Sequence, residues 1–137
     1  MSTLKVDNLL NAAGNESPIS VPGASKAWVA YDQANNNVLD SFNVGSVIDN
    51  SAGDFTVNFT NALSNANYCV AGTIANTNDN FSSIVAATTR GQGGVQIKGT
   101  VAPTTTSVTV ESYYGAHPSV NAAKSDFSRS YIVLFGD

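Results

Sequence analysis

Apolar and polar residues alternate in short runs along the chain, and clusters of Asn, Gly, Asp and Ser separate these runs. In one such run, Phe55, Val57 and Phe59 fall on one side of an extended backbone and the two polar residues between them fall on the other. This period of two predicts a strand with one buried face. No segment keeps a helical period, so the pattern predicts an all-β fold.

About eight short strands separated by turn residues are typical of an antiparallel β-sandwich or a jelly-roll-like domain. The chain of 137 residues suits one compact domain with a single core. The predicted strands are 27–32, 38–48, 55–59, 67–76, 81–89, 94–101, 106–114 and 128–135.

Two carboxylates bracket the polar stretch Asp49–Asp54, which lies between two predicted strands. Its residues tolerate positive φ or hydrogen-bond their own backbone, so a hairpin turn accounts for it. A calcium loop would place more oxygen ligands at alternating positions, so we predict a turn. Replacing Asp49 or Asp54 by Ala should then cost roughly 1 kcal/mol. Asn76–Asn80 is predicted as a connecting loop, with a cation or sugar contact as the alternative.

Both ends of the sequence carry apolar residues that one sandwich does not need. Residues 2–24 have too few of them for a core and too many to stay solvated, so we expect this segment to pack on another chain. The run Ser130–Asp137 is apolar on both faces, as in a central strand or a strand at a subunit contact. We therefore divide the chain into an extended stalk, 1–24, and a β-sandwich domain, 25–137. The candidate oligomerisation residues are Leu4, Val6, Leu9 and Leu10.

Charge and hydropathy exclude two classes of partner. The net charge is −4 and the six basic residues are scattered, so no surface for nucleic acid is expected. No apolar run approaches the roughly 20 residues that cross a bilayer, and the first residues lack the layout of a secretory signal, so we expect assembly in a cytoplasm without membrane insertion. Only 12% of the residues are charged, and abundant Asn, Ser and Thr suit hydroxyl-rich ligands.

No residue pattern indicates catalysis. His117 is the only histidine, so neither a multi-histidine metal centre nor a catalytic relay can be built around it alone. Arg90–Val95 fits a strand connection better than an anion site. The acidic residues single out no catalytic pair, and Cys69, in an apolar run, is predicted to be buried and inert. The sequence therefore predicts a non-enzymatic protein without cofactor or metal.

Four motifs in order, Lys-Ala-Trp-Val from Lys26, Ser-Phe-Asn-Val from Ser41, Gly-Asp-Phe-Thr-Val-Asn-Phe from Gly53 and Asn-Tyr-Cys-Val-Ala-Gly from Asn67, cover much of the domain. With the leading residues 2–14, they resemble the β-sandwich module, or receptor-binding knob, at the ends of bacteriophage tail fibres and virion spikes. The resemblance implies a homotrimeric adhesin of the virion that binds host-surface carbohydrate. It also implies contacts with other virion proteins through the N-terminal segment and assembly in the bacterial host's cytoplasm.

The large residues of these motifs are expected to fill the core rather than to bind sugar. They are Trp28, Phe42, Phe55, Phe59 and Tyr68. A second function stays open, because a capsid- or tail-decorating structural protein without receptor binding would need the same fold and the same N-terminal anchor.

The number of strands predicts at which end of the sandwich each loop lies, and so where a receptor site would be. In an antiparallel sandwich, successive loops alternate between the two ends. The loops 49–54, 77–80 and 102–105 then share the end where the stalk enters, and 33–37, 61–66, 90–93 and 115–127 lie at the opposite tip. Amides, donors and an aromatic ring at that tip suit sugar hydroxyls. The candidate receptor-binding residues are Asn35, Asn36, Asn37, Arg90, Tyr114 and His117. Binding between subunits is the alternative, and one miscounted strand would exchange the ends.

Overall fold

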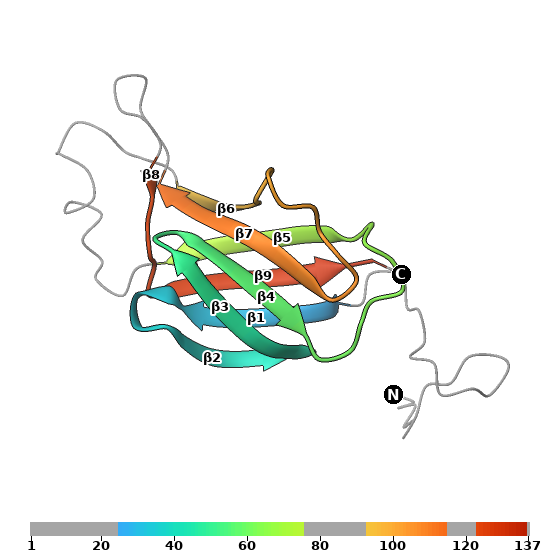
Figure 1. Cartoon of the computed structure of the whole chain (residues 1–137). Coiled ribbons are helices and arrows are strands. Elements are labelled where there is room, and N and C mark those ends of the chain that lie inside the picture. Colours follow the sequence, from blue (N-terminus) through green and yellow to red (C-terminus); the bar gives the residue numbers. More distant parts are fainter. Residues whose placement is uncertain (1–24, 76–92, 115–122, 137) are drawn as a thin grey trace, which may run out of the picture.

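The computed structural model describes residues 25–75, 93–114 and 123–136, and these form two antiparallel sheets packed face to face (Figure 1). The all-β sandwich predicted from the alternation of residues is therefore confirmed. Within the described ranges, no helix is long and apolar enough to cross a membrane.

The sheets differ in strand order. Sheet I has the order β2-β1-β9-β5, and sheet II has the order β3-β4-β7-β6, with the short β8 beside the end of β7. The bounds in sheet I are Ser25–Asp32 for β1, Asn37–Phe42 for β2, Cys69–Ala75 for β5 and Arg129–Phe135 for β9. The bounds in sheet II are Val44–Ser51 for β3, Asp54–Phe59 for β4, Gly93–Ile97 for β6, Ser107–Tyr114 for β7 and Ala123–Lys124 for β8.

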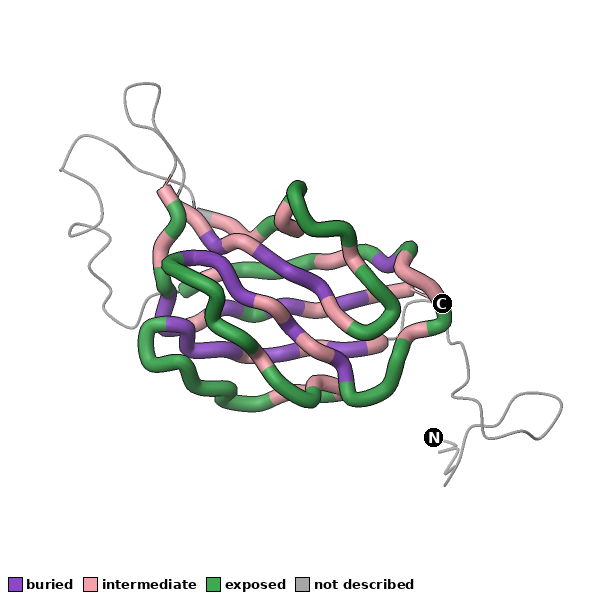
Figure 2. The backbone as a smooth tube through the Cα atoms, viewed as in Figure 1, coloured by how far each residue is buried: buried purple, intermediate pink, exposed green. Residues whose placement is uncertain are grey.

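The core lies between the sheets and is built from every second residue of the central strands (Figure 2). Phe55 and Val57 of β4 are fully buried and Phe59 nearly so, as the alternation predicts. Tyr31 packs its ring 5.0 Å from that of Phe55, and Tyr68 meets Phe59 edge-on. The other buried apolar residues are Ala27, Val29, Val108, Val110, Phe127, Ile132 and Leu134.

The C-terminal run forms a central strand, one of the two predictions for it. β9 pairs with β1 on one side and with β5 on the other. Ile132 and Leu134 enter the core, whereas Tyr131 stays 43% exposed on the outer face of sheet I.

The predicted strand 38–48 is wrong as a single strand. It breaks at Asn43, whose φ of 54° is left-handed, and the two halves enter different sheets as β2 and β3. The Asn43 side chain holds this corner, because its Nδ2 donates to the carbonyls of Lys26 and Asn61 and its Oδ1 accepts from the Asn61 amide. Asn tolerates the left-handed conformation better than other non-glycine residues.

The remaining strand predictions have mixed outcomes. Those at 27–32, 55–59, 67–76, 106–114 and 128–135 correspond to β1, β4, β5, β7 and β9 within a few residues, and 94–101 contains most of β6. The predicted strand 81–89 lies outside the described residues. The two-residue β8 was not predicted, because two residues are too few to show a period.

Three predicted burials are wrong. Cys69 is exposed, and Phe42 is 52% exposed. Trp28 is only half-buried, because it lies between the buried Ala27 and Val29 and so belongs to the outer set of its strand. The pleat makes neighbouring side chains face opposite sides, and all three residues fall on the outer side of sheet I.

Because the predicted strand 38–48 is two strands, some connections lie at the opposite end of the domain from the one predicted. We name the end where β1 begins the entry end and the end where β1 finishes at Asp32 the far end. The turn between β3 and β4 lies at the far end and the connection 60–68 at the entry end, contrary to the count from the sequence. The connection 98–106 lies at the entry end and Gln33–Asn36 at the far end, as predicted.

The residues that flank three further segments, 76–92, 115–122 and 125–128, also lie at the far end. Ala75 pairs with Arg129 near the Tyr31 end of β9, and Gly93 and Ala123 both pair with Tyr114. The connections 76–92 and 115–122 lie outside the described residues, but all four flanking residues mark the far end. The described connections at the end opposite Ser25 are therefore 33–36, 52–53 and 125–128.

Candidate functional site

A buried glutamine connects the two sheets at the far end. Gln33 is only 2% exposed, and its backbone amide donates to the carbonyl of Phe127 at 3.0 Å. Its Nε2 donates to the carbonyl of Ser51 at 3.3 Å and, more weakly, to Asp49 Oδ1 at 3.4 Å. Its Oε1 accepts from the Ser112 hydroxyl at 3.1 Å. Gln33 thus joins the connection between β1 and β2 to the end of β3, to β7 and to the segment before β9.

Gln33 begins the short 3₁₀ helix η1, Gln33–Asn35, which reverses the chain between β1 and β2. Asp32 caps it by accepting from the backbone amide and the side-chain amide of Asn35. Asn36 ends it in the left-handed region, with φ 49°, and accepts from the Tyr31 hydroxyl at 2.9 Å. Burial, with nearby acidic side chains, raises the pKa of Tyr31 to about 12, so the phenol stays a donor at neutral pH.

The turn between β3 and β4 confirms the predicted hairpin, although only Ala52 and Gly53 are outside the strands. Gly53 has φ 63° and is buried. Its amide donates to Asp126 Oδ1 at 2.7 Å, and its carbonyl accepts from the Ser112 amide at 2.9 Å. The hairpin tip is therefore held against β7 and the segment before β9.

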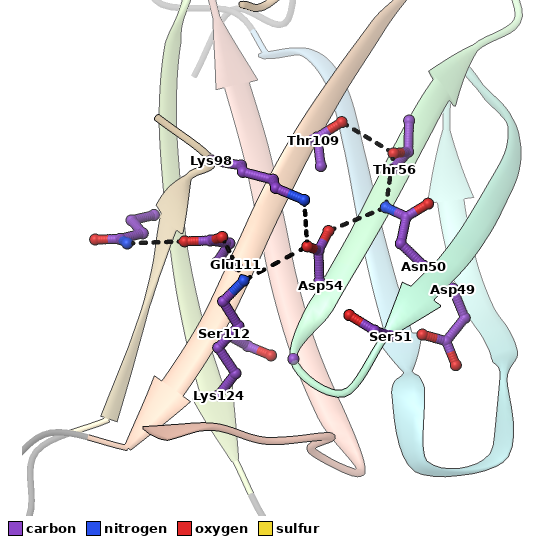
Figure 3. Close-up of polar contacts among 12 residues, drawn as sticks. Asp49, Asn50, Ser51, Asp54, Thr56, Lys98, Thr109, Glu111, Ser112 and Lys124 are labelled. Carbon is purple, nitrogen blue, oxygen red and sulfur yellow. Dashed lines mark hydrogen bonds and ion pairs between the residues drawn. The ribbon is translucent and has the colours of Figure 1, made fainter. Parts of the chain in front are cut away.

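A row of charged side chains lies on the outer face of sheet II next to this turn. Figure 3 shows Lys98, Glu111 and Lys124 around Asp54, and we call these four residues the Asp54 cluster. Lys98 Nζ lies 2.5 Å from Asp54 Oδ2, and Lys124 Nζ lies 3.6 Å from the same oxygen and 2.6 Å from Glu111 Oε1. Asn50 Nδ2 adds a hydrogen bond to Asp54 Oδ1 at 3.0 Å.

The cluster keeps its carboxylates ionised. Burial by itself would raise the pKa of Asp54, but the hydrogen bonds from Lys98 and Asn50 outweigh it and the pKa is lowered. The hydrogen bond from Lys124 lowers the pKa of Glu111, and the same bond raises the pKa of Lys124. Two cations and two anions leave the cluster neutral, so it offers hydrogen-bonding groups without attracting one sign of charge.

The far end therefore presents polar groups on a backbone that is held by hydrogen bonds. Asn37, Asn50, Ser51 and Asp126 are exposed there, and the Lys124 side chain is 44% exposed. Within the described part of the chain, no group of three or more His, Cys, Asp or Glu side chains lies close enough to hold a metal ion.

The structure places the predicted receptor residues as follows. Asn35, Asn36 and Asn37 lie together at the far end, but the first two also hold the turn through Asp32 and Tyr31. The backbone of Tyr114 ends β7 at the far end. Arg90 and His117 lie outside the described residues, as do the candidate oligomerisation residues Leu4, Val6, Leu9 and Leu10.

The sequence reasoning missed Gln33 and the Asp54 cluster as parts of this end. The alternation did signal that residues 54, 56 and 58 share a polar face. It could not show that Asp54 lies opposite Glu111, because that register joins β4 to β7. Nothing near Gln33 in the sequence marks a buried amide.

The two carboxylates of the hairpin should contribute differently to stability, in contrast to the equal cost expected from the sequence. Asp54→Ala should lower the free energy of unfolding by about 2 kcal/mol, because charged hydrogen bonds to a buried oxygen are lost. Asp49 is exposed and accepts one long bond, so Asp49→Ala should cost less than about 0.5 kcal/mol. Urea unfolding of both variants at pH 7 measures the difference, and equal costs would contradict it.

Acid should remove the Asp54 contribution. Because the pKa of Asp54 is lowered in the folded chain, its ionised carboxylate stabilises the fold. This contribution is fully present above the ordinary Asp pKa of about 4 and is lost as the pH falls through the lowered pKa. The gap between the parent protein and Asp54→Asn should therefore narrow toward pH 2 in the same urea titrations. A gap that is independent of pH would mean that the ionised carboxylate is not what stabilises this turn.

Comparison with protein-family models, with curated proteins and with solved structures gave no match to this chain.

Proposed function

We propose that this protein is a non-enzymatic adhesin of a bacteriophage fibre or spike and that its far end binds host-surface carbohydrate. The observation that carries the proposal is that three described connections, 33–36, 52–53 and 125–128, meet at the far end, and the candidate stalk joins the domain at the opposite end, at Ser25. Recognition commonly resides on loops that a rigid β scaffold presents at a free end. The resemblance of the four sequence motifs to tail-fibre modules points to the same role.

The chemistry of the far end suits a neutral or weakly charged glycan. Sugar hydroxyls both donate and accept hydrogen bonds, and the exposed amide of Asn37 does the same. Asn50 offers its Oδ1 as an acceptor, because its Nδ2 already donates to Asp54 and Thr56. The neutral Asp54 cluster adds Lys124 as a donor without a strong local field. The buried Gln33 and Gly53 contacts hold these groups in place, which lowers the entropic cost of binding.

In this proposal the protein is a homotrimer on the virion, assembled in the bacterial cytoplasm and joined to other virion proteins through residues 1–24. Binding between subunits stays an alternative location for the glycan. A decorating role on the capsid or tail, without receptor binding, is the second candidate function. The exposed apolar side chains on the outer face of sheet I favour it, because such a face suits contacts with other proteins.

Binding to glycans and host cells distinguishes the adhesin role from the decorating role. Ala34 and Ala52 are exposed at the tips of η1 and of the β3–β4 turn, and neither side chain forms a polar contact that a substitution would remove. The double variant Ala34→Arg and Ala52→Arg should weaken binding to a bacterial glycan array and to host cells at least about tenfold by blocking the tip. Its melting temperature should not change.

The matched control is Ala102→Arg, an exposed alanine at the entry end, which should bind like the parent. Full binding by the double variant would remove the far end from consideration. Binding to capsids or tails without binding to any glycan or host cell would favour the decorating role.

A further inference from the structure

The outer face of sheet I carries a row of apolar side chains that crosses all four strands. Register places Phe42 of β2 opposite Trp28 of β1, Trp28 opposite Val133 of β9, and Val133 opposite Ala71 of β5. Paired residues share a face, so these four side chains form one row. The next row is Asp40, Ala30, Tyr131 and Thr73, and Phe135 lies opposite Cys69.

Nothing in the described part of the chain covers this face. Phe42 is 52% and Tyr131 is 43% exposed, and Cys69 is exposed. The outer face of sheet II contrasts with it, because Thr56, Thr109 and the Asp54 cluster satisfy one another there through hydrogen bonds. The outer face of sheet II therefore carries a connected polar network, whereas the outer face of sheet I leaves an apolar row open.

We propose that the outer face of sheet I is the surface on which a second copy of this chain docks. The charges on this face support a second copy as the occupant. Its strands place two acidic and two basic side chains on the outer side, Asp32, Asp40, Lys26 and Arg129, and Arg129 already lies 3.9 Å from Asp32. The whole chain carries −4, so docking through a neutral face brings two like-charged molecules together where repulsion is smallest.

The size of the face limits how tightly a second copy can bind. Four strands about 4.8 Å apart and about six residues long cover on the order of 400 Å² in projection. A standard interface takes about 800 Å² from each partner, so this face alone supports weak, concentration-dependent association. The 24 residues that precede β1 enter at its first residue, Ser25, in this same sheet, and they can strengthen the association.

Trp28 is the only tryptophan of the chain and lies in the middle of this face, so it reports on docking directly. In the full-length protein, its emission should move to shorter wavelength as the concentration rises. The mass from light scattering should rise over the same range.

Phe42→Arg should weaken this association at least about tenfold, because it places a charge in the apolar row, and Tyr131→Arg should act in the same direction, because it places a charge beside that row. Ile48 on the outer face of sheet II is also 52% exposed, so Ile48→Arg is the matched control and should associate like the parent. Circular dichroism and melting should show all three variants folded.

Three results would overturn the proposal. The first is unchanged association in both Phe42→Arg and Tyr131→Arg. The second is a monomer with short-wavelength Trp28 emission at every dilution, which would mean that the chain's own residues 1–24 cover the face. The third is a monomer with solvent-exposed Trp28 at every concentration, which would leave the face to a different virion protein. Glycan binding at the far end does not enter any of these outcomes, so the test is independent of the proposed adhesin role.

Discussion

Gly53→Ala is expected to lower the free energy of unfolding by about 3 to 5 kcal/mol. Two costs add at this position. The φ of 63° is left-handed, which an alanine adopts with strain. The added Cβ would also come within 2.4 Å of the Ser112 carbonyl oxygen, 2.5 Å of the Ser125 nitrogen and 2.7 Å of Lys124 Cβ. Two of these atoms are backbone, so they cannot move away without breaking the packing of the turn on β7.

Thermal and urea unfolding measure this cost, which should correspond to a fall in melting temperature on the order of 10 °C. Gly99→Ala is the control, because a Cβ there meets no heavy atom within 4 Å and the residue has no left-handed φ. The control should stay within about 0.5 kcal/mol of the parent. A Gly53→Ala protein as stable as Gly99→Ala would show that the hairpin tip does not pack against β7.

Gln33→Leu is expected to cost about 3 kcal/mol, although leucine is apolar and similar in length. The substitution removes the partner of the buried Ser112 hydroxyl and of the Ser51 carbonyl. Ser112 keeps its bond to the Ser125 carbonyl, so its loss is partial. The backbone bond from residue 33 to Phe127 is retained, so the cost comes from the side chain alone.

Gln96→Leu is the matched control, because Gln96 is an exposed glutamine with one bond to the Glu111 side chain. Water can replace that bond, so the control should cost less than about 0.5 kcal/mol. Urea unfolding compares the two variants. If both cost the same, the Gln33 amide does not link the sheets.

The alternation of residues determined the fold class and most of the strands. Phe55, Val57 and Phe59 face the core because successive side chains of a strand point to opposite sides, which is a property of the local backbone. The apolar C-terminal run was also informative, since β9 lies between two partner strands. The turn residues around Gly53 indicated a hairpin because few other residues adopt its backbone conformation.

Alternation does not say which sheet a strand joins. The break at Asn43 depends on hydrogen bonds to the backbone at Lys26 and Asn61, and both partners are far away in sequence. Because the break at Asn43 was not recognised, the strand count predicted the Asp49–Asp54 turn at the wrong end of the domain. For the same reason, the sequence could not show that Asp54, Lys98 and Lys124 meet.

The misjudged burials have a related cause. Trp28, Phe42 and Cys69 are apolar residues on the outer side of their strands. The C-terminal run is apolar on both faces, but nothing in the sequence places these three residues in the same sheet as that run. Local periods thus determined which residues form strands. Only the tertiary structure decided how the strands are paired and which apolar face stays open, because each of these depends on contacts between residues that are distant along the chain.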